Sequence, residues 1–127
     1  MVSIRTDDPD FTAEAFLALA QRVWPGERDA GRTAAALARS VNVGAWDADR
    51  LVGAVRVVTD GYFFACVSEI LVDPAYQGQG IGRRLMDAAL ADAPRGRLFL
   101  GAQPQSVGFF ERLGYARGPV GFVATRP

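Results

Sequence analysis

Hydrophobic and polar residues follow two different periods at the start of the chain. Residues 2–6 alternate between apolar and polar side chains, which predicts a short strand. In residues 11–23 the apolar positions recur at helical spacing, and Pro25 and Gly26 end that pattern. Residues 30–40 are rich in alanine and predict a second helix.

The middle of the chain favours strands. Residues 41–47 and 50–60 are rich in valine, and we expect two strands joined by a short polar turn. Asp60 and Gly61 lie between apolar runs, which is the pattern of a two-residue hairpin turn. Residues 62–72 are therefore expected to return antiparallel beside the preceding strand.

The last third of the chain returns to alternating helices and strands. Apolar positions in 85–90 lie on one helical face before Pro94 ends the segment. A strand at 97–102, a helix at 105–114 and a closing pair of strands within 115–126 complete the pattern. This order predicts an α+β fold with a mixed, mostly antiparallel central sheet and helices on both faces.

Length and composition indicate one domain. Of the 127 residues 50% are hydrophobic, so residues 1–127 suffice for a single domain with its own core. No apolar run approaches the roughly 18 residues that cross a bilayer, and residues 1–10 carry acidic residues and a proline where a signal peptide is apolar. We therefore expect a cytoplasmic protein without a membrane partner. Cys66 is the only cysteine, which argues against a disulfide and a structural metal site.

The charged residues narrow the chemistry further. Acidic and basic residues balance at 14 each, so the composition gives no electrostatic reason to expect nucleic acid as a partner. Every basic residue is arginine, and the chain contains neither lysine nor histidine. Serine–histidine nucleophile pairs, Schiff-base lysines and histidine-ligated metals are thereby excluded. We expect small-molecule partners, no metal, and proton transfer by carboxylate, tyrosine, cysteine or water.

The segment YQGQGIGRRLM, residues 76–86, places three glycines at alternate positions before a predicted helix. Without side chains the backbone of this loop can approach a ligand and turn its amides inward, which makes a cradle for an anion. The spacing matches neither a dinucleotide fingerprint nor a P-loop, because Arg83 stands where glycine is required and no lysine follows. A plain tight turn followed by two solvated arginines is the alternative.

The segment ILVDPAYQGQGIGRRLMDAAL resembles the signature of the Gcn5-related N-acetyltransferase (GNAT) superfamily, an apolar strand and a proline step followed by a glutamine- and glycine-containing loop. A second family element, an aromatic pair followed by a glycine–aromatic step, is matched by FFERLGY at 109–115. Together with the order of elements, the resemblance extends over most of residues 41–120.

The resemblance implies transfer of an acetyl group from acetyl-CoA to a primary amine of a small molecule or peptide, by direct attack in a ternary complex. A CoA-binding sensor or partner domain without turnover is the alternative, and a homodimer is left open. The family loop holds the pyrophosphate, the preceding strand pairs with pantetheine, and the next helix contributes an amide and an aromatic pair. The implied cofactor-binding residues are Leu71, Val72, Gln77, Gly78, Gln79, Gly80, Ile81, Gly82, Arg83, Arg84, Gln103, Phe109 and Phe110.

Glu69 is the candidate catalytic base, because an amine must lose a proton before it attacks and Glu69 is the only glutamate in a predicted strand. A structural carboxylate paired with arginine is the alternative. The two-residue turn would set Arg56 opposite Ala65, roughly 13 Å along the strand from Glu69 at a rise of about 3.3 Å per residue. That register argues against an Arg56–Glu69 pair.

Phe110 departs from the family pattern, which commonly has a tyrosine there as the acid that protonates the departing thiolate. The sequence contains Tyr62, Tyr76 and Tyr115 but does not place any of them near that thiolate. Neither the acceptor amine nor the acyl preference can be deduced, because the start of the chain has no recognisable motif. Trp24 and Trp46 are expected in the core or in the wall of the site.

Overall fold

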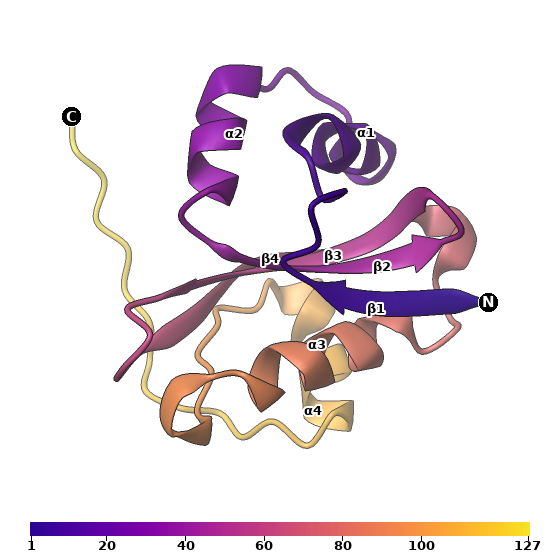
Figure 1. Ribbon diagram of the computed structural model, residues 1–127. Coiled ribbons are helices and arrows are strands. Elements are labelled where there is room, and N and C mark those ends of the chain that lie inside the picture. Colours follow the sequence, from indigo (N-terminus) through magenta and orange to yellow (C-terminus); the bar gives the residue numbers. More distant parts are fainter.

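Four strands form one antiparallel sheet in chain order, and the helices lie on its two faces (Figure 1). The structure is a computed structural model that describes residues 1–127. The strands are β1 (Val2–Thr6), β2 (Val41–Asp47), β3 (Arg50–Thr59) and β4 (Ala65–Val72). The helices are α1 (Ala13–Val23), α2 (Ala30–Leu37), α3 (Ile81–Ala91) and α4 (Val107–Arg112). The predicted α+β class with helices on both faces is confirmed.

Local signals explain the two N-terminal helices. The Thr12 hydroxyl accepts a hydrogen bond from the amide of Ala15 at 3.1 Å, and the Asp29 carboxylate accepts one from the amide of Arg32 at 2.8 Å. Each cap satisfies a donor that the first turn of a helix leaves unpaired. None of the helices is long and apolar enough to cross a membrane.

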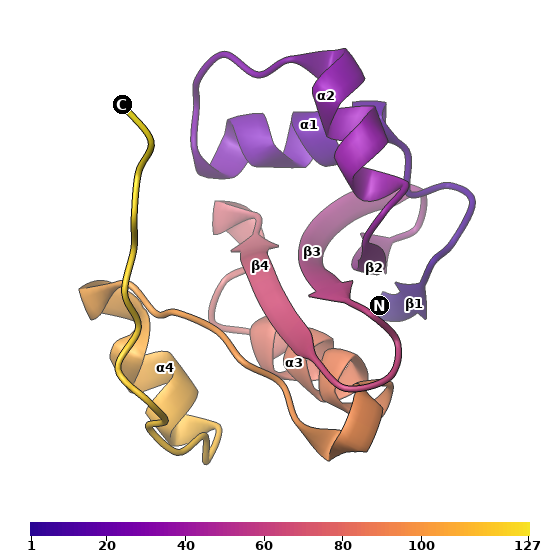
Figure 2. The same cartoon turned by 90° about the vertical axis from the view of Figure 1, so that its left-hand side faces the viewer.

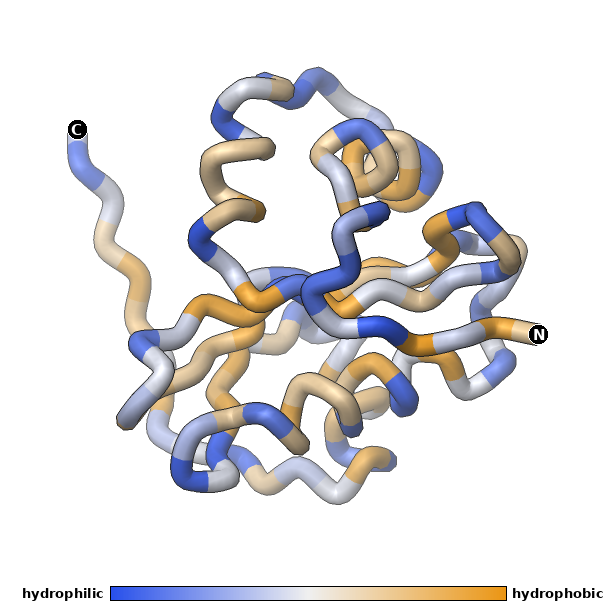
Figure 3. The backbone as a smooth tube through the Cα atoms, in the orientation of Figure 1, coloured by the Kyte–Doolittle hydropathy of each residue, from blue (hydrophilic) through white to orange (hydrophobic).

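The sheet separates two hydrophobic clusters. One packs between the sheet and the α3 side, around Val43, Val55 and Leu85, all fully buried. The other packs between the sheet and α1, around Leu19 and Leu71. Figure 3 shows apolar segments running through the strands and the adjoining parts of the helices. Both faces of the central strands are therefore covered, as expected for a three-layer arrangement.

The β3–β4 connection differs from the predicted two-residue turn. Its loop comprises residues 60–64, because the Asp60 carboxylate accepts hydrogen bonds from the amides of Phe63, Tyr62 and Phe64 at 2.8–3.1 Å. These amides, that of Phe63 first, hold the pKa of the Asp60 carboxyl below its usual value. The prediction of a turn at Asp60-Gly61 alone is wrong, since an aspartate that accepts from three amides stabilises a wider loop.

The register of the β3–β4 pair is shifted accordingly. Thr59 pairs with Ala65, and an irregularity between Arg56 and Val57 leaves Ser68 as an extra residue in β4. Arg56 therefore stands opposite Glu69 and not opposite Ala65, which corrects the sequence-based expectation.

The C-terminal part forms less regular structure than the pattern predicted. Helix α4 is preceded by a single 3₁₀ turn, Pro104–Ser106, and the strand expected at 97–102 is reduced to one parallel bridge between Phe99 and Cys66. Two hydrogen bonds make that bridge: the amide of Val67 to the carbonyl of Phe99 at 2.8 Å, and the amide of Phe99 to the carbonyl of Ala65 at 2.9 Å. This isolated bridge is the only parallel pairing, so the four-stranded sheet itself is antiparallel and not mixed as predicted.

The closing strands predicted within 115–126 are absent. Residues 116–127 run away from the sheet as an extended tail (Figure 2). Pro119 removes one backbone donor, and Gly118 and Gly121 favour irregular backbone, so the segment is a poor strand. Val120, Phe122 and Val123 in this tail are 80%, 93% and 95% exposed.

Candidate active site

The free edge of β4 is the first component of the site. β4 is the last strand of the sheet, and Phe99 pairs only with its beginning before that segment diverges (Figure 2). Residues 69–72 consequently have a strand partner on the β3 side alone. An extended ligand that adds itself to a sheet edge by backbone hydrogen bonds finds its position here.

The glycine loop continues directly from this edge. Gly78 and Gly80 have φ angles of +80° and +79°, and no heavy atom lies within 4 Å of the position a Cβ would occupy on either. Their requirement is conformational, because other L-residues adopt this region only at a cost. Gly80 precedes α3 without a side-chain cap, so the first amides of the helix face outward unsatisfied. This open, positively polarised helix end fits the predicted cradle for a pyrophosphate.

Gly82 has a different role from the other two glycines. A Cβ there would lie 3.0 Å from Cζ of Phe109, so the glycine allows α4 to pack closely against the first turn of α3. Phe109 is half-buried at this contact and lies next to the loop. Phe109 is thus placed beside the predicted cofactor site by steric fit.

The two arginines after the loop are tied to backbone carbonyls. Nη2 of Arg83 donates to the carbonyl of Arg112 at 3.1 Å, which ends α4, and Nη1 of Arg84 donates to the carbonyl of Val2 at 2.9 Å. Both side chains are otherwise exposed. They therefore join the start of α3 to α4 and to β1, and their remaining N–H groups are available to an anion.

The other predicted cofactor-binding residues are placed unevenly. The side chains of Leu71 and Ile81 are 2% and 3% exposed, so neither side chain can contact a ligand. The backbone of Leu71 faces β3, on the same side as the Asp73 amide that bonds to Val52, and therefore does not lie at the free edge. Gln77 donates its side-chain amide to the carbonyl of Val72 at 3.1 Å, at the end of β4. Gln79 and Gln103 are exposed, and Gln103 stands before the 3₁₀ turn that leads into α4.

Phe110 lies in the core. It is 8% exposed, packs in the hydrophobic cluster under α3, and its ring centroid is 5.0 Å from that of Phe109 and 5.9 Å from that of Tyr115. Of the aromatic pair, Phe109 is therefore the more accessible member. A contact between Phe110 and a ligand would involve only its small exposed part.

Glu69 forms a two-point ion pair with Arg56. The distances are 2.8 Å from Nε to Oε1 and 3.0 Å from Nη2 to Oε2, and both side chains are 21% exposed. Nη2 of Arg56 also contacts the hydroxyl of Ser68 at 2.7 Å, and Nη1 that of Ser40 at 3.2 Å. The pair fixes the carboxylate in one orientation, while each of its oxygens keeps a further lone pair.

The extra residue in β4 also decides which way Glu69 faces. Val67 packs with the cluster on the α3 side, whereas Leu71 packs with the cluster on the α1 side. Glu69 lines a cavity of about 180 Å³ between α1 and β4. The cavity brings together two aromatic rings, one arginine and one carboxylate, and its lining is Phe16, Ala20, Trp24, Arg28, Glu69 and Leu71.

The two tryptophans lie in the two kinds of position expected from the sequence, the wall of the site and the core. Trp24 at the end of α1 is 56% exposed and forms part of the cavity wall, while Trp46 is 2% exposed in the core. The cavity lining contains no tyrosine. Tyr62 is 76% exposed in the β3–β4 loop.

Tyr76 and Tyr115 are occupied elsewhere. The hydroxyl of Tyr76 donates to the Asp47 carboxylate, and this bond, with burial and the carboxylate charge, raises the pKa of Tyr76. Burial, followed by the nearby Asp87 charge, raises the pKa of Tyr115, whose hydroxyl is buried without a hydrogen-bond partner. Both phenols therefore stay protonated at neutral pH.

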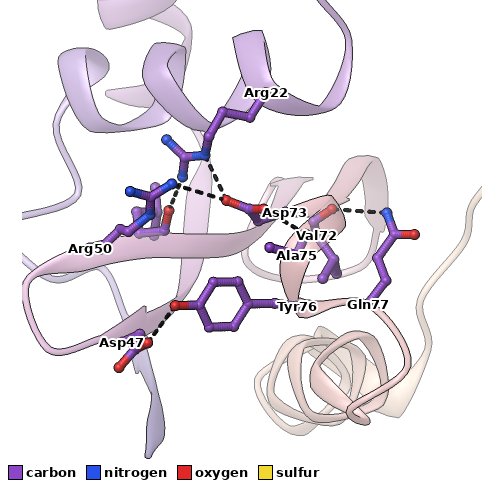
Figure 4. Close-up of polar contacts among 9 residues, drawn as sticks. Arg22, Asp47, Arg50, Val72, Asp73, Ala75, Tyr76 and Gln77 are labelled. Atoms are coloured by element: carbon purple, nitrogen blue, oxygen red, sulfur yellow. Dashed lines mark hydrogen bonds and ion pairs between the residues drawn. The ribbon is translucent and has the colours of Figure 1, made fainter.

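Asp73 is a residue that the sequence reading missed (Figure 4). It is 3% exposed and accepts hydrogen bonds from Nε of Arg22 at 2.7 Å and from the amide of Ala75 at 2.9 Å, with Nη2 of Arg50 at 3.5 Å. Burial by itself would raise the pKa of the Asp73 carboxyl, but the Ala75 amide and the two arginines outweigh burial and lower it. The sequence contains one indication of this role: an aspartate directly before a proline at the end of a strand is typical of the N-cap of a helical turn.

Comparison with known proteins agrees with this geometry. The model of the acetyltransferase (GNAT) domain family matches residues 8–123. A rice protein (Oryza sativa subsp. japonica) named serotonin N-acetyltransferase 2, chloroplastic, is 41% identical over 76 residues, which are 57% of this chain and 38% of that protein. The solved GNAT family acetyltransferase SP0256 from Streptococcus pneumoniae TIGR4 is 29% identical, with a TM-score of 0.84 over 99% of this chain and 98% of that one.

A more distant structure shares the fold alone. Aminoglycoside N-acetyltransferase AAC(6')-Iy, solved with a bisubstrate analogue that contains CoA, has a TM-score of 0.77 at 18% identity, over 100% of this chain and 99% of that one. The curated relatives are longer than this chain, which spans 59% of one of them and 29–38% of three others. Because the family model covers nearly the whole chain, the protein belongs to the GNAT acetyltransferase family.

Proposed function

We propose that the protein is an N-acetyltransferase that uses acetyl-CoA as cosubstrate and a primary amine of a small molecule or peptide as acceptor. The observation that carries the proposal is the junction of β4 and α3. There an unpaired strand edge leads into two left-handed glycines and an uncapped helix N-terminus. Such a junction suits a ligand that is extended at one end and anionic at the other.

The chain's own residues divide the work of binding. In this proposal the amides from Gly78 to Gly82 hold the pyrophosphate, and the backbone groups of Ile70 and Val72 meet the amides of pantetheine. Ile70 takes the place of the predicted Leu71, because the Asp73 amide bonds to Val52 and alternate residues of β4 share the side that faces β3. Phe109 adds an apolar wall beside the loop. No metal is part of the proposal.

Bound acetyl-CoA supplies an activated acetyl group: the C–N bond to the acceptor forms as the C–S bond breaks. The attacking nitrogen then gives up its second proton to water, and water delivers a proton to the departing thiolate, so that an amide and the CoA thiol are the products. Glu69 is the proposed base that removes a proton from the acceptor ammonium, directly or through one water. It lines the cavity beside β4, and Arg56 holds its carboxylate in place. Water is assigned to the acid step because the cavity lining contains no tyrosine.

The cavity favours an acceptor with an apolar body. Phe16 and Trp24 supply apolar walls, and the one carboxylate of the lining is already neutralised by Arg56. A polyamine or aminoglycoside carries several positive charges that would find no unpaired carboxylate here. The similarity to a relative named for serotonin, an arylalkylamine, points the same way.

Release of CoA thiol from acetyl-CoA in the presence of a panel of amines tests the proposal. The panel holds arylalkyl monoamines, aliphatic monoamines, a polyamine, an aminoglycoside and a short peptide. We expect amine-dependent release with at least one primary amine, strongest for arylalkyl monoamines, and formation of the matching amide by mass spectrometry. Thiol release that no amine accelerates would contradict the proposal.

A CoA-binding domain without turnover is the second candidate, and the observation in its favour is Phe110. A phenyl ring in the core stands where the family commonly has the acidic phenol. Tight calorimetric binding of CoA without amine-dependent release would support this candidate.

We also propose a homodimer and a cytoplasmic location, both of which stay predictions. The apolar side chains of the C-terminal tail, at positions 120, 122 and 123, support the dimer because large exposed apolar residues favour association. Light scattering coupled to gel filtration, on the full chain and on a chain ending at Gly118, gives the mass of each. A monomeric full chain would contradict the dimer.

A further inference from the structure

The last turn of α1 is weakly held by packing. Phe16, Leu19 and Ala20 are the buried residues of this helix, whereas Val23 is only half-buried and Trp24 is 56% exposed. The chain beyond Trp24 is exposed until α2. Few buried apolar contacts mean that this turn opens more easily than the rest of the helix.

Arg22 provides the polar anchor of that turn. Its Nε donates to the Asp73 carboxylate at 2.7 Å, and its Nη2 donates to the carbonyl of Leu51 at 2.6 Å (Figure 4). Its neighbours on α1, Ala20 and Trp24, line the cavity beside Glu69. The position of this cavity wall therefore depends on the contacts of Arg22 with Asp73 and with the Leu51 carbonyl.

Asp73 lies between β3 and the turn that leads into the glycine loop. Its backbone amide donates to the carbonyl of Val52 at 2.8 Å, and its carboxylate caps the 3₁₀ turn Pro74–Tyr76, through which the chain enters the loop. Tyr76 and Gln77, the next residues, bond to Asp47 and to the carbonyl of Val72 (Figure 4). The Asp73 carboxylate therefore joins Arg22 to the turn through which the chain enters the loop.

From these contacts we infer that the Arg22–Asp73 pair is a positioning link, through which a ligand in the glycine loop stabilises the α1 wall of the acceptor cavity. The inference rests on the proposed function, because it takes the loop to be the CoA site and the cavity to be the acceptor site. The link joins two elements 51 residues apart in sequence. By thermodynamic reciprocity an acceptor that orders α1 also tightens CoA binding.

Arg50 supplies a matched control. It approaches the same carboxylate, at 3.5 Å and with 56% of its side chain exposed, but it comes from the start of β3 and not from α1. An Arg50→Gln variant removes a positive charge beside Asp73 and leaves the loop connected to α1. An Arg22→Gln variant also removes one positive charge beside Asp73, but it breaks the connection between Asp73 and α1.

Amide hydrogen exchange, measured with and without saturating CoA, tests the link. In the wild type and in Arg50→Gln, CoA is expected to slow exchange in residues 19–24 at least about threefold. In Arg22→Gln, CoA is expected to protect the loop and the start of α3 but to leave residues 19–24 unchanged. Arg22→Lys, which keeps the charge but cannot contact both Asp73 and the Leu51 carbonyl with a planar fork, should recover part of the protection.

The outcomes separate the link from the function on which it rests. CoA-induced protection of α1 that is equal in Arg22→Gln and wild type would refute the link while leaving the CoA site standing. A wild-type protein that does not bind CoA by calorimetry would overturn both. If Arg22→Gln does not fold, Asp73→Asn serves in its place, because an asparagine keeps one oxygen as the acceptor for the Ala75 amide and turns an NH2 donor, which cannot accept, toward Nε of Arg22.

A purely structural role gives a different pattern. A general loss of stability would speed exchange across β2 and α3 as well, with or without CoA. The link predicts instead that β2 and α3 keep wild-type exchange and that only the response of residues 19–24 to CoA disappears.

Discussion

Replacing Gly80 by valine gives the sharpest test of the cradle. Gly80 has a φ of +79°, and nothing lies within 4 Å of its missing Cβ, so the Cβ of a substituted residue meets no neighbouring atom. It does disfavour the left-handed conformation, by about 1–2 kcal/mol for an ordinary L-residue and more for a β-branched one. The loop is then expected to relax to negative φ, which turns the peptide groups on either side of residue 80.

The expected loss follows from the amides that the loop presents. A hydrogen bond from an amide to a charged oxygen contributes about 1.5–3 kcal/mol, so misdirecting one of them lowers CoA affinity by roughly tenfold or more, since about 1.4 kcal/mol corresponds to tenfold. Isothermal titration calorimetry with CoA measures this loss, and thermal unfolding shows whether the variant is folded.

Gly82→Ala is expected to lower stability more than CoA affinity, which is the opposite of Gly80→Val. Its Cβ would meet Cζ of Phe109 at 3.0 Å, so the change should lower stability by about 1–3 kcal/mol through overpacking between α3 and α4, with a smaller effect on CoA affinity than Gly80→Val. A folded Gly80→Val protein with wild-type CoA affinity would refute the reasoning. Equal losses of affinity in the two variants would also do so.

Three further predictions concern the acidic and aromatic residues. Glu69→Gln should lower kcat by roughly 10²–10⁴ with CoA affinity retained; if stability and activity fall together, the Arg56 pair is structural. The pKa of Asp73 is lowered in the folded state, so the stability it contributes is complete above the unfolded pKa of about 3.9 and is lost as pH falls through the folded pKa. Urea unfolding between pH 2 and 6 should therefore show a shallower acid decline for Asp73→Asn than for wild type, and identical slopes would contradict this. Phe110→Tyr should raise kcat if thiolate protonation limits the rate, but it should also cost about 1–3 kcal/mol of stability, because the ring is 8% exposed in the core. An unchanged or lower kcat in the folded variant would show that the phenol is not the missing acid.

Elements with a clear local pattern could be predicted from the sequence. Alternation and helical spacing predicted the strands at 2–6, 41–47 and 50–60 and a helix after the glycine loop. The structure has Val2–Thr6, Val41–Asp47, Arg50–Thr59 and Ile81–Ala91. The glycine loop could also be placed, although two glycines serve conformation and the third serves packing against Phe109. That distinction needs the position of α4, which no local pattern contains.

The register of β4 could not be predicted from the sequence. The argument against an Arg56–Glu69 ion pair depended on that register and was therefore wrong. A loop of five residues in place of two shifts the pairing by three positions, and the extra Ser68 shifts it by one more. The total of four moves Arg56 from Ala65 to Glu69. Asp60 and its three amide contacts cause the first shift, while the second is an irregularity within the sheet.

The Arg22–Asp73 pair could not be predicted either, because its two residues are distant in sequence. Arg22 and Asp73 lie on elements whose meeting is decided by the packing of α1 against β3 and β4. The exposed tail of residues 116–127 is the converse case, since its apolar pattern resembles a strand but no neighbouring strand pairs with it.

The absence of lysine and histidine affects how the pH dependence of the reaction is interpreted. Its titratable lining is limited to Glu69 and Arg28, and a guanidinium stays protonated at every physiological pH. Arg56 and Arg22, which hold the two carboxylates of β4 and its adjoining turn, are likewise invariant in charge. An increase in rate between about pH 7 and 9 cannot come from a histidine or lysine of the protein, and the cavity lining contains no cysteine or tyrosine. We therefore expect it to report the deprotonation of the acceptor ammonium, whose pKa is about 10.4 when it is a simple alkylamine. The pH profile of this protein thus becomes a measurement of its substrate, and changing the acceptor to an amine of lower pKa should move the profile by the same amount.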